Sequence, residues 1–198
     1  MQLTLIAATL ASAVAFAPAP LTKTKAAPLK AVEDLPGVVD AFPGFFDPLG
    51  IADGKSEQRI KYFREAELKH GRIAMLASVG FLVAEKFHPL FGGNIDAPSY
   101  LAFQQTPLQT FWPFVVTAIG WIEYSTSVVN FEAPGEALWT LKADYENGDV
   151  GFDPLGLKPT DADALKDMQT RELQNGRLAM LGIAGMVVQE LITGNTLF

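Results

Sequence analysis

Residues 67–76 read Glu-Leu-Lys-His-Gly-Arg-Ile-Ala-Met-Leu, and residues 172–181 read Glu-Leu-Gln-Asn-Gly-Arg-Leu-Ala-Met-Leu. The two decapeptides lie 105 residues apart and are identical at seven positions. Each follows a copy of Phe-Asp-Pro-Leu-Gly, found at residues 46–50 and 152–156. An internal repeat of this kind indicates a duplicated structural unit. The chain therefore contains two copies of one unit, with a different segment between them.

Each copy predicts a tight turn followed by a long helix. Asp-Pro-Leu-Gly suits a turn, because Pro fixes φ and Gly adopts backbone angles closed to other residues. Ser56 is a suitable cap for the first helix, which we expect to end near Phe87. Thr160 or Asp161 is a suitable cap for the second, which we expect to end near Thr193. Helices of about 32 residues are about 48 Å long, so they would tilt within, or project beyond, a hydrocarbon core of about 30 Å.

A third helix is expected between the two copies. Residues 111–129 are almost purely apolar, and Glu123 is their only charged residue, which makes this stretch the clearest single transmembrane candidate. The Thr-Pro pair at 106–107 suits the helix start, while Pro113 predicts a shifted start or a bend. The acidic stretch 144–149 is predicted to be a solvated connection. We therefore expect an all-α membrane protein with three transmembrane helices, the first and third long, crossing and related by pseudo-two-fold symmetry.

The first 30 residues have the composition of a leader. Residues 1–15 are apolar and end in Ala-Val-Ala, as in a removable signal peptide, and their apolar run is too short to span a bilayer. Residues 16–30 hold Ala, Thr and Lys without an acidic residue, which is typical of a transit peptide. This two-part leader resembles those of plastids surrounded by extra membranes. The alternative is a single secretory signal followed by a disordered pro-segment, and in either case residues 31–198 form one domain.

Composition excludes several classes of function. The chain has no Cys, which removes disulfide frameworks, thiolate zinc sites and cysteine nucleophiles. The formal net charge of -7 argues against nucleic acid as a partner, because phosphate binding needs a basic surface. Hydrophobic residues make up 49% of the chain, a value that suits a membrane protein but also fits a soluble core.

The charged residues of each repeat precede an apolar half-helix, where an unpaired charge is costly. Glu67 and Arg72 are five residues apart, about 140° around the helix, so they pair poorly with each other. If the two helices cross near the motif, Glu67 can pair with Arg177, and Glu172 with Arg72. Small residues that would let the two backbones approach closely lie at the same place: Gly71, Ala74, Gly176 and Ala179.

Oxygen and nitrogen donors lie beside these ion pairs. Glu67 and His70 are three residues apart on one side of a helix, as are Glu172 and Asn175. Gln189 lies on nearly the same face as Asn175, about 21 Å further along. Magnesium accepts oxygen ligands, and the magnesium of a chlorophyll needs one axial ligand, which an Arg-neutralised carboxylate can supply. Alternatively, the histidine is a hydrogen-bonded core residue and each Glu/Arg pair is only a salt bridge; the duplication favours the ligand interpretation.

The two motifs, Glu-x-x-His-x-Arg and Glu-x-x-Asn-x-Arg, resemble the paired signature of the chlorophyll-binding light-harvesting proteins. The Phe-Asp-Pro-Leu-Gly-Leu segment and Gln189 fit the same family. The resemblance covers about residues 42–88 and 150–193. With its two-part leader, the chain is most similar to the fucoxanthin–chlorophyll a/c-binding proteins of algae with secondary plastids.

This resemblance implies an antenna protein rather than an enzyme. Its cofactors would be chlorophyll a, chlorophyll c and fucoxanthin or a related carotenoid, and it would pass excitation energy to a photosystem. The protein would lie in the plastid thylakoid membrane, and residues 31–198 would cross this membrane several times. Its partners would be membrane lipid, a photosystem core and other antenna subunits in homo- or hetero-oligomers.

The resemblance also implies roles for particular residues. The axial ligands of chlorophyll magnesium would be Glu67, His70, Glu172, Asn175 and Gln189. The glutamates would be neutralised from the opposite helix by Arg72 and Arg177. Glu123 in the middle helix is either a further ligand or an interfacial carboxylate near the helix end, and His88 is a candidate outside the main motif. The ends of the carotenoids would lie near Phe46, Asp47, Phe152 and Asp153.

Three alternatives remain open. A di-metal enzyme uses the Glu-x-x-His spacing of Glu67 and His70, but the second copy has Asn175, and an Arg beside each motif disfavours a second cation. A pigment-free membrane scaffold or transporter also has repeats and buried charges. Within the resembling family, a photoprotective member would dissipate excitation energy instead of passing it on.

Overall fold

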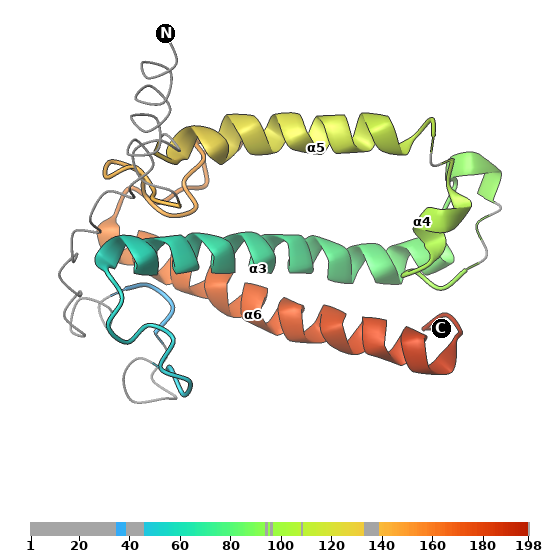
Figure 1. Cartoon of the computed structure of the whole chain (residues 1–198), viewed down its shortest axis with the longest axis horizontal. Coiled ribbons are helices and arrows are strands. Elements are labelled where there is room, and N and C mark those ends of the chain that lie inside the picture. The colour runs from blue at the N-terminus through green and yellow to red at the C-terminus, as the bar shows by residue number, and fades with distance from the viewer. Residues whose placement is uncertain are drawn as a thin grey trace, which may run out of the picture.

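The computed structural model describes residues 35–38, 46–93, 95, 97–107, 109–132 and 139–197. The leader predicted over residues 1–30 lies outside these described residues. The described part is helical, and its only strand-like pairing is an isolated bridge between Phe131 and Leu141 (Figure 1). The all-α prediction is therefore confirmed for the described residues.

Six helical segments follow one another along the described chain. The α-helices are α3 (Glu57–Lys86), α4 (Ala102–Gln105), α5 (Trp112–Thr126) and α6 (Ala162–Thr193). The short 3-10 helices are η2 (Leu90–Gly93) and η3 (Val128–Asn130). The two long helices, α3 and α6, contain the two copies of the repeat.

Side-chain caps set the first turns of both long helices. The Ser56 hydroxyl accepts a hydrogen bond from the Arg59 N–H, so α3 begins where the sequence predicts. The Asp161 carboxylate accepts from the Ala164 N–H, which makes Asp161 rather than Thr160 the cap of α6. At its other end α6 stops at Gly194, whose φ of 66° is a left-handed conformation that suits Gly.

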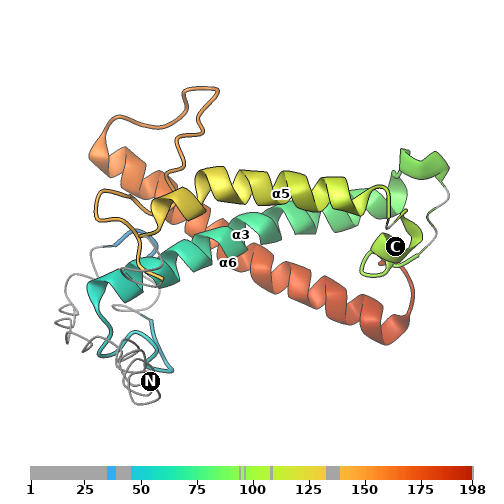
Figure 2. The same cartoon turned by 45° about the horizontal axis from the view of Figure 1, so that its top comes forward.

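The long helices cross at the repeated glycines (Figure 2). A Cβ added to Gly71 would lie 3.0 Å from the Cα of Gly176, and a Cβ on Gly176 would lie 3.0 Å from the Cα of Gly71. Any side chain larger than hydrogen at either position would therefore strike the facing backbone. Leu68, Ala74 and Leu173 are buried around this point, so the close approach predicted from the small residues is confirmed.

The middle helix begins later than the Thr-Pro pair predicts. Thr106 lies at the end of α4, and its hydroxyl accepts a hydrogen bond from the indole N–H of Trp112 at 2.6 Å. Helix α5 starts at Trp112, with Pro113 in its first turn, where a missing N–H costs nothing. The start predicted at residues 106–107 is wrong, while the shift predicted from Pro113 is confirmed.

Helix α5 runs along α3 without packing against it (Figure 1). In the described part of the chain, no Cα atom of α5 lies within 8 Å of a Cα atom of α3 or α6. None of its residues is buried, and Phe114 and Trp121 are 75% and 74% exposed. An apolar helix with so much exposed surface needs an apolar environment that protein atoms do not provide here.

One helix of the described chain, α6, is long and apolar enough to cross a membrane by length and composition. Only 11% of its most apolar stretch is buried inside the protein, unlike the core helix of a soluble domain. Helix α3 contains more charged residues, and α5 has 15 residues, about 22 Å. The helix count and pseudo-two-fold symmetry expected for the membrane domain therefore remain predictions.

The acidic stretch 144–149 packs against α3, although its sequence predicts a solvated connection. The Tyr145 hydroxyl and the Gly148 N–H donate hydrogen bonds to the Glu65 carboxylate at 3.1 and 2.9 Å. The Asn147 amide donates to the Lys61 carbonyl at 2.6 Å. The acidic residues Asp144, Glu146 and Asp149 are exposed, as a solvated connection predicts, while Tyr145, Asn147 and Gly148 are half-buried by these contacts, which the composition does not reveal.

Candidate functional site

Two reciprocal ion pairs join the long helices at the crossing. Arg72 of α3 donates from Nε to Oε1 of Glu172 at 2.7 Å, and Arg177 of α6 donates from Nε to Oε1 of Glu67 at 2.6 Å. These are the pairs that the repeat predicts, and both are short charge-assisted hydrogen bonds. The structure therefore confirms this pairing.

In each ion pair one of the two carboxylate oxygens of the glutamate accepts no hydrogen bond from the described residues. Among the described residues, only Oε1 of Glu67 and of Glu172 accepts a hydrogen bond. Both carboxylate side chains are 32% exposed. Each pair is thus electrically neutral, and Oε2 of its glutamate accepts no hydrogen bond from the described residues.

His70 lies three residues after Glu67 on α3 and is exposed. Its Nδ1 is 2.7 Å from the Ala66 carbonyl oxygen, which can only accept, so Nδ1 carries the proton. The neutral ring then has its lone pair on the exposed Nε2, the arrangement of a histidine ligand. His88 has the same kind of bond to the Ala84 carbonyl at 2.9 Å, beyond the C-terminus of α3.

The remaining ligand candidates of α6, Asn175 and Gln189, have exposed side chains. Large apolar side chains around them, including Leu178 and Leu181, are 70% and 75% exposed. Amide oxygens placed within an exposed apolar surface are suited to hold a ligand that is itself mostly apolar.

Glu123 of α5 has partners that the sequence analysis missed. Lys69 of α3 donates to the Glu123 carboxylate and also to the hydroxyl of Ser127, just beyond α5. Lys69 thereby links α3 to α5 across a gap in which their backbones do not meet. The Glu123 side chain is still 48% exposed, so this carboxylate is also neutralised and accessible.

The two Asp-Pro-Leu-Gly turns have the same structure. Gly50 and Gly156 have φ of 62° and 63°, which favours Gly at both turn ends. Asp47 accepts from the N–H groups of the two residues after Gly50, and Asp153 does the same after Gly156. These bonds, above all those from the Ala52 and Lys158 N–H groups, hold the pKa of Asp47 and Asp153 below the usual value.

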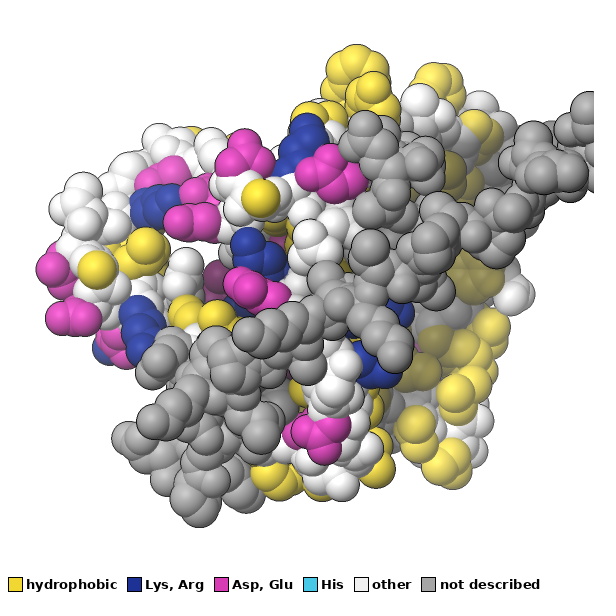
Figure 3. Space-filling view, turned by 60° about the vertical axis from the view of Figure 1, so that its left-hand side comes forward, with side chains coloured by type: hydrophobic (Ala, Val, Ile, Leu, Met, Phe, Trp, Pro, Cys, Tyr) yellow, Lys and Arg dark blue, Asp and Glu magenta, His cyan; other side chains and the backbone are white. Residues whose placement is uncertain are grey.

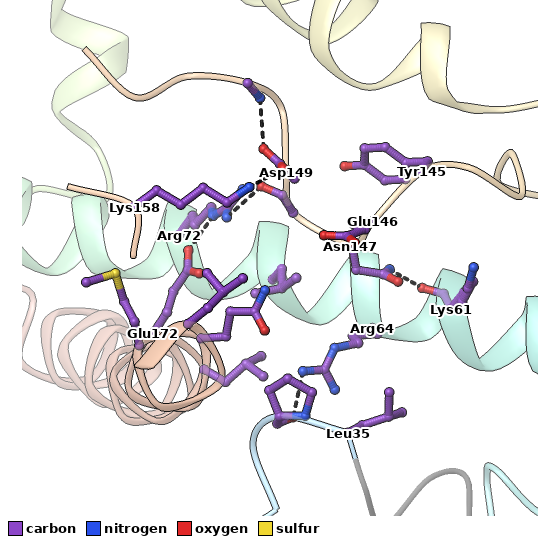
Figure 4. A pocket seen from close by; sticks show the side chains of 18 of the residues that line it. Leu35, Lys61, Arg64, Arg72, Tyr145, Glu146, Asn147, Asp149, Lys158 and Glu172 are labelled. Atoms are coloured by element: carbon purple, nitrogen blue, oxygen red, sulfur yellow. Dashed lines mark hydrogen bonds and ion pairs between the residues drawn. The ribbon is translucent and has the colours of Figure 1, made fainter. Parts of the chain in front are cut away.

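A cavity of about 1120 Å³ opens where α3 and α6 begin (Figure 4). Arg72, Glu172, Phe152 and Asp153 line it, so one turn and one ion pair face the same space. Figure 3 views this end of the molecule, where acidic and basic side chains gather on one side and hydrophobic side chains on another. Phe46 and Asp47 of the other turn do not line this cavity.

Two buried glutamates were not singled out as site residues by the sequence analysis. Glu65 is 5% exposed and holds the loop at Gly148, as described above. Glu190 is fully buried and accepts from the N–H groups of Ser99 and Tyr100 at 3.2 and 3.0 Å. Its repeat counterpart Glu85 accepts from the Leu197 N–H. The partners are mostly backbone groups, which leave no signal in the sequence.

The metal-binding side chains of the described residues do not form a cluster. In the part of the chain that the structure describes, no group of three or more His, Asp or Glu side chains is placed to hold a metal ion. The di-metal alternative requires several carboxylates and two histidines around one site. The described residues show no such group.

Comparison with known proteins identifies the family. The family model for chlorophyll A-B binding protein matches residues 31–191. The chain is 47% identical over 172 residues to light-harvesting complex stress-related protein 3.2 of Chlamydomonas reinhardtii, covering 84% of this chain and 66% of the relative. It is 46% identical over 169 residues to the fucoxanthin-chlorophyll a-c binding protein of Isochrysis galbana, covering 82% and 78%.

A third relative matches over a longer stretch. The fucoxanthin-chlorophyll a-c binding protein D of Phaeodactylum tricornutum is 35% identical over 199 residues, covering 96% of this chain and 95% of the relative. All three relatives are described as chloroplastic. The family is one of pigment-binding light-harvesting proteins and not of enzymes. Because the family model matches most of its length, the chain belongs to the chlorophyll a/b-binding protein family.

Proposed function

We propose that this protein is a light-harvesting antenna of the plastid thylakoid membrane that binds chlorophylls and a fucoxanthin-type carotenoid. It passes excitation energy to a photosystem core. The observation that carries the proposal is the reciprocal pairing of Arg72 with Glu172 and of Arg177 with Glu67. Each pair offers a neutralised carboxylate at the centre of two apolar helices, and one oxygen of this carboxylate accepts no hydrogen bond from the described residues.

The residues at the crossing fit a magnesium tetrapyrrole. Carboxylate, amide and imidazole groups can each occupy a single axial position, and oxygen donors suit magnesium. We assign one chlorophyll magnesium, of the a or c type, to each of five residues: Glu67, His70, Glu172, Asn175 and Gln189. Bound chlorophyll supplies light absorption and the excited state. The protein fixes the position of each ring through these donors.

The exposed apolar surfaces support pigment and lipid as the surrounding medium. Phe114 and Trp121 on α5, and Leu178 and Leu181 on α6, are at least 70% exposed. We propose that α3, α5 and α6 all span the membrane, with α5 and η3 together extending from residue 112 to residue 130. Chlorophyll then fills the space between α3 and α5, where Glu123 is a further candidate ligand. His88 is retained as a candidate beyond α3.

The paired turns are proposed to hold the ends of carotenoids. Phe46 and Phe152 are 65% and 83% exposed and lie next to Asp47 and Asp153. An exposed aromatic ring beside a charged turn suits a molecule with an apolar body and a polar end group. Other antenna subunits are proposed as neighbours in the membrane, alongside lipid.

Pigment reconstitution tests this proposal. The chain is refolded in detergent with a chlorophyll and carotenoid extract, and bound pigment is counted per protein for His70→Ala and Asn175→Ala. Each variant is expected to lose a discrete share of chlorophyll. Gln174→Ala serves as the matched control, because Gln174 is the exposed neighbour of Asn175 and is not assigned a pigment. Equal pigment content in all four proteins would refute the ligand assignment.

A second candidate function is photoprotective dissipation of excitation energy. It is favoured by the identity of 47% to a stress-related light-harvesting protein, which is close to the 46% for a fucoxanthin-chlorophyll protein. Chlorophyll fluorescence lifetime separates the two functions. A harvesting antenna keeps a long fluorescence lifetime at both neutral and acidic pH. A dissipating protein has a fluorescence lifetime that shortens when the pH is lowered from neutral to acidic.

A further inference from the structure

The two arginines of the crossing each have a second acceptor, and this acceptor is a glycine carbonyl in a loop. Arg72 donates from Nη2 to the Gly148 carbonyl at 3.0 Å, and Arg177 donates from Nη1 to the Gly37 carbonyl at 2.8 Å. Each guanidinium is therefore held at two points, by a glutamate of the facing helix and by a loop. The direction of the guanidinium fixes where the glutamate must lie.

Each glycine is held in turn by a residue of the helix that carries the arginine. The Gly148 N–H donates to the Glu65 carboxylate of α3 at 2.9 Å. The Gly37 N–H donates to the Thr170 hydroxyl of α6 at 3.1 Å. Glu65 and Thr170 are 105 residues apart, the offset of the repeat, so the same helix position performs the same task in both copies.

A third repeated residue completes what we term the two glycine clamps. The first consists of Glu65, Leu68 and Arg72 around Gly148, and the second consists of Thr170, Leu173 and Arg177 around Gly37. Positions i, i+3 and i+7 lie on one face of a helix. Both glycines have positive φ, 79° and 95°, and an added Cβ would lie 2.9 and 2.7 Å from the leucine side chain. Only glycine therefore fits between the two polar groups.

The clamps differ in the group that accepts from the glycine N–H. Glu65 is a carboxylate that is 5% exposed and also accepts from the Tyr145 hydroxyl, whereas Thr170 is neutral and half-buried. Burial and the nearby Glu65 charge raise the pKa of Tyr145 to about 12. The first clamp therefore includes a buried negative charge and the second does not, while Arg64 of α3 also holds the second loop by donating to the Pro36 carbonyl at 2.6 Å.

We propose that Glu65 and Thr170 are positioning residues for the two pigment-ligating glutamates. Thr170 orients Glu67 through Gly37 and Arg177, and Glu65 orients Glu172 through Gly148 and Arg72. This inference rests on the proposed function, because it assigns the glutamates as ligands. It predicts that each residue controls the pigment held across the crossing, on the facing helix, rather than any pigment on its own helix.

Difference spectra of the reconstituted full chain test the assignment. The difference between the spectra of the wild-type chain and of Glu67→Ala gives the visible absorption and circular dichroism of the pigment at the Glu67 site. The Glu172→Ala variant gives the same spectra for the Glu172 site. Thr170→Val removes the acceptor but keeps the side-chain shape, and Thr170→Ser restores it. We expect Thr170→Val to raise the chlorophyll concentration for half-occupancy of the Glu67 site about 2- to 10-fold, the effect of losing one neutral hydrogen bond, and Thr170→Ser to return it to the wild-type value. The Glu172 site is expected to remain unchanged.

Glu65→Leu is the matched variant in the first clamp, since it removes the acceptor of the Gly148 N–H. Glu65→Leu is expected to weaken the Glu172 site alone, and Glu65→Gln, whose amide oxygen still accepts, is expected to keep that site near its wild-type occupancy. Loss of both sites in parallel by Thr170→Val, or loss of neither, overturns the positioning role while leaving the antenna proposal intact. A wild-type chain that folds and binds no pigment overturns the antenna proposal and the positioning role together, so the two failures are distinguishable.

Discussion

Substitution of Gly71 by Val tests whether the helix crossing depends on direct contact between backbones. A Cβ at this position would lie 3.0 Å from the Cα and 3.5 Å from the carbonyl carbon of Gly176. Backbone atoms cannot move aside as a flexible side chain can, so the helices must separate. Overpacking of this kind costs about 1–3 kcal/mol. The higher helix propensity of Val than of Gly offsets only about 0.4 kcal/mol of this cost. Gly71→Val is therefore expected to lower the free energy of unfolding by about 1–3 kcal/mol.

Gly80 is the matched control, because it lies in the same helix and a Cβ there would meet nothing within 4 Å. Gly80→Val is expected to change the free energy of unfolding by less than about 0.5 kcal/mol. Both variants are refolded in detergent, and unfolding is followed by far-ultraviolet circular dichroism with increasing denaturant. Equal stability of the two variants would contradict the close crossing.

Three further predictions concern the loops and the middle helix. Lys69→Met removes the link to Glu123 and is expected to broaden spin-label distances between α3 and α5, while Lys69→Arg preserves them; an unchanged distribution would refute the link. Glu190→Ala leaves the two backbone N–H groups of Ser99 and Tyr100 without an acceptor. It is expected to lower the free energy of unfolding, measured by denaturant titration, by about 1–3 kcal/mol for each group. A loss below about 0.5 kcal/mol, the range of surface substitutions, would contradict the buried role of Glu190. Backbone N–H groups bind Asp153 in its ionised form, so its stabilisation of the turn is complete above the usual carboxyl pKa and is lost only as pH falls through the lowered pKa of Asp153. Carbon-13 titration of the Asp153 carboxyl is expected to give a midpoint below 3.8. A midpoint at or above 3.8 would contradict the hydrogen bonds assigned to this carboxylate.

The duplicated motif was sufficient to predict the centre of the molecule. Identical residues at a fixed offset specified both arginine–glutamate pairs and the glycine contact, because a charge within an apolar helix needs a partner and the second copy supplies it. Caps at Ser56 and Asp161 likewise follow from local chemistry. These features depend on nearby residues or on the repeat itself, which is why the sequence reveals them.

Contacts between loops and helices could not be predicted in the same way. Glu65 and Thr170 occupy equivalent positions but differ in chemistry, so the repeat does not mark them. Their partners are backbone groups of glycines, and a backbone group has no identity in the sequence. The pairing of Lys69 with Glu123 joins two helices that are not copies of each other, so no internal comparison indicates it.

Carotenoid-sensitised chlorophyll emission is the most direct measurement of the antenna proposal. The full chain is refolded with chlorophyll and a fucoxanthin-type carotenoid, and the excitation spectrum of chlorophyll fluorescence is recorded after unbound pigment is removed. A carotenoid band in that spectrum, absent when Glu67 and Glu172 are both replaced by Ala, is the result that we predict. A folded helical chain that retains no pigment, or one whose chlorophyll emits only on direct excitation, would contradict the proposed function.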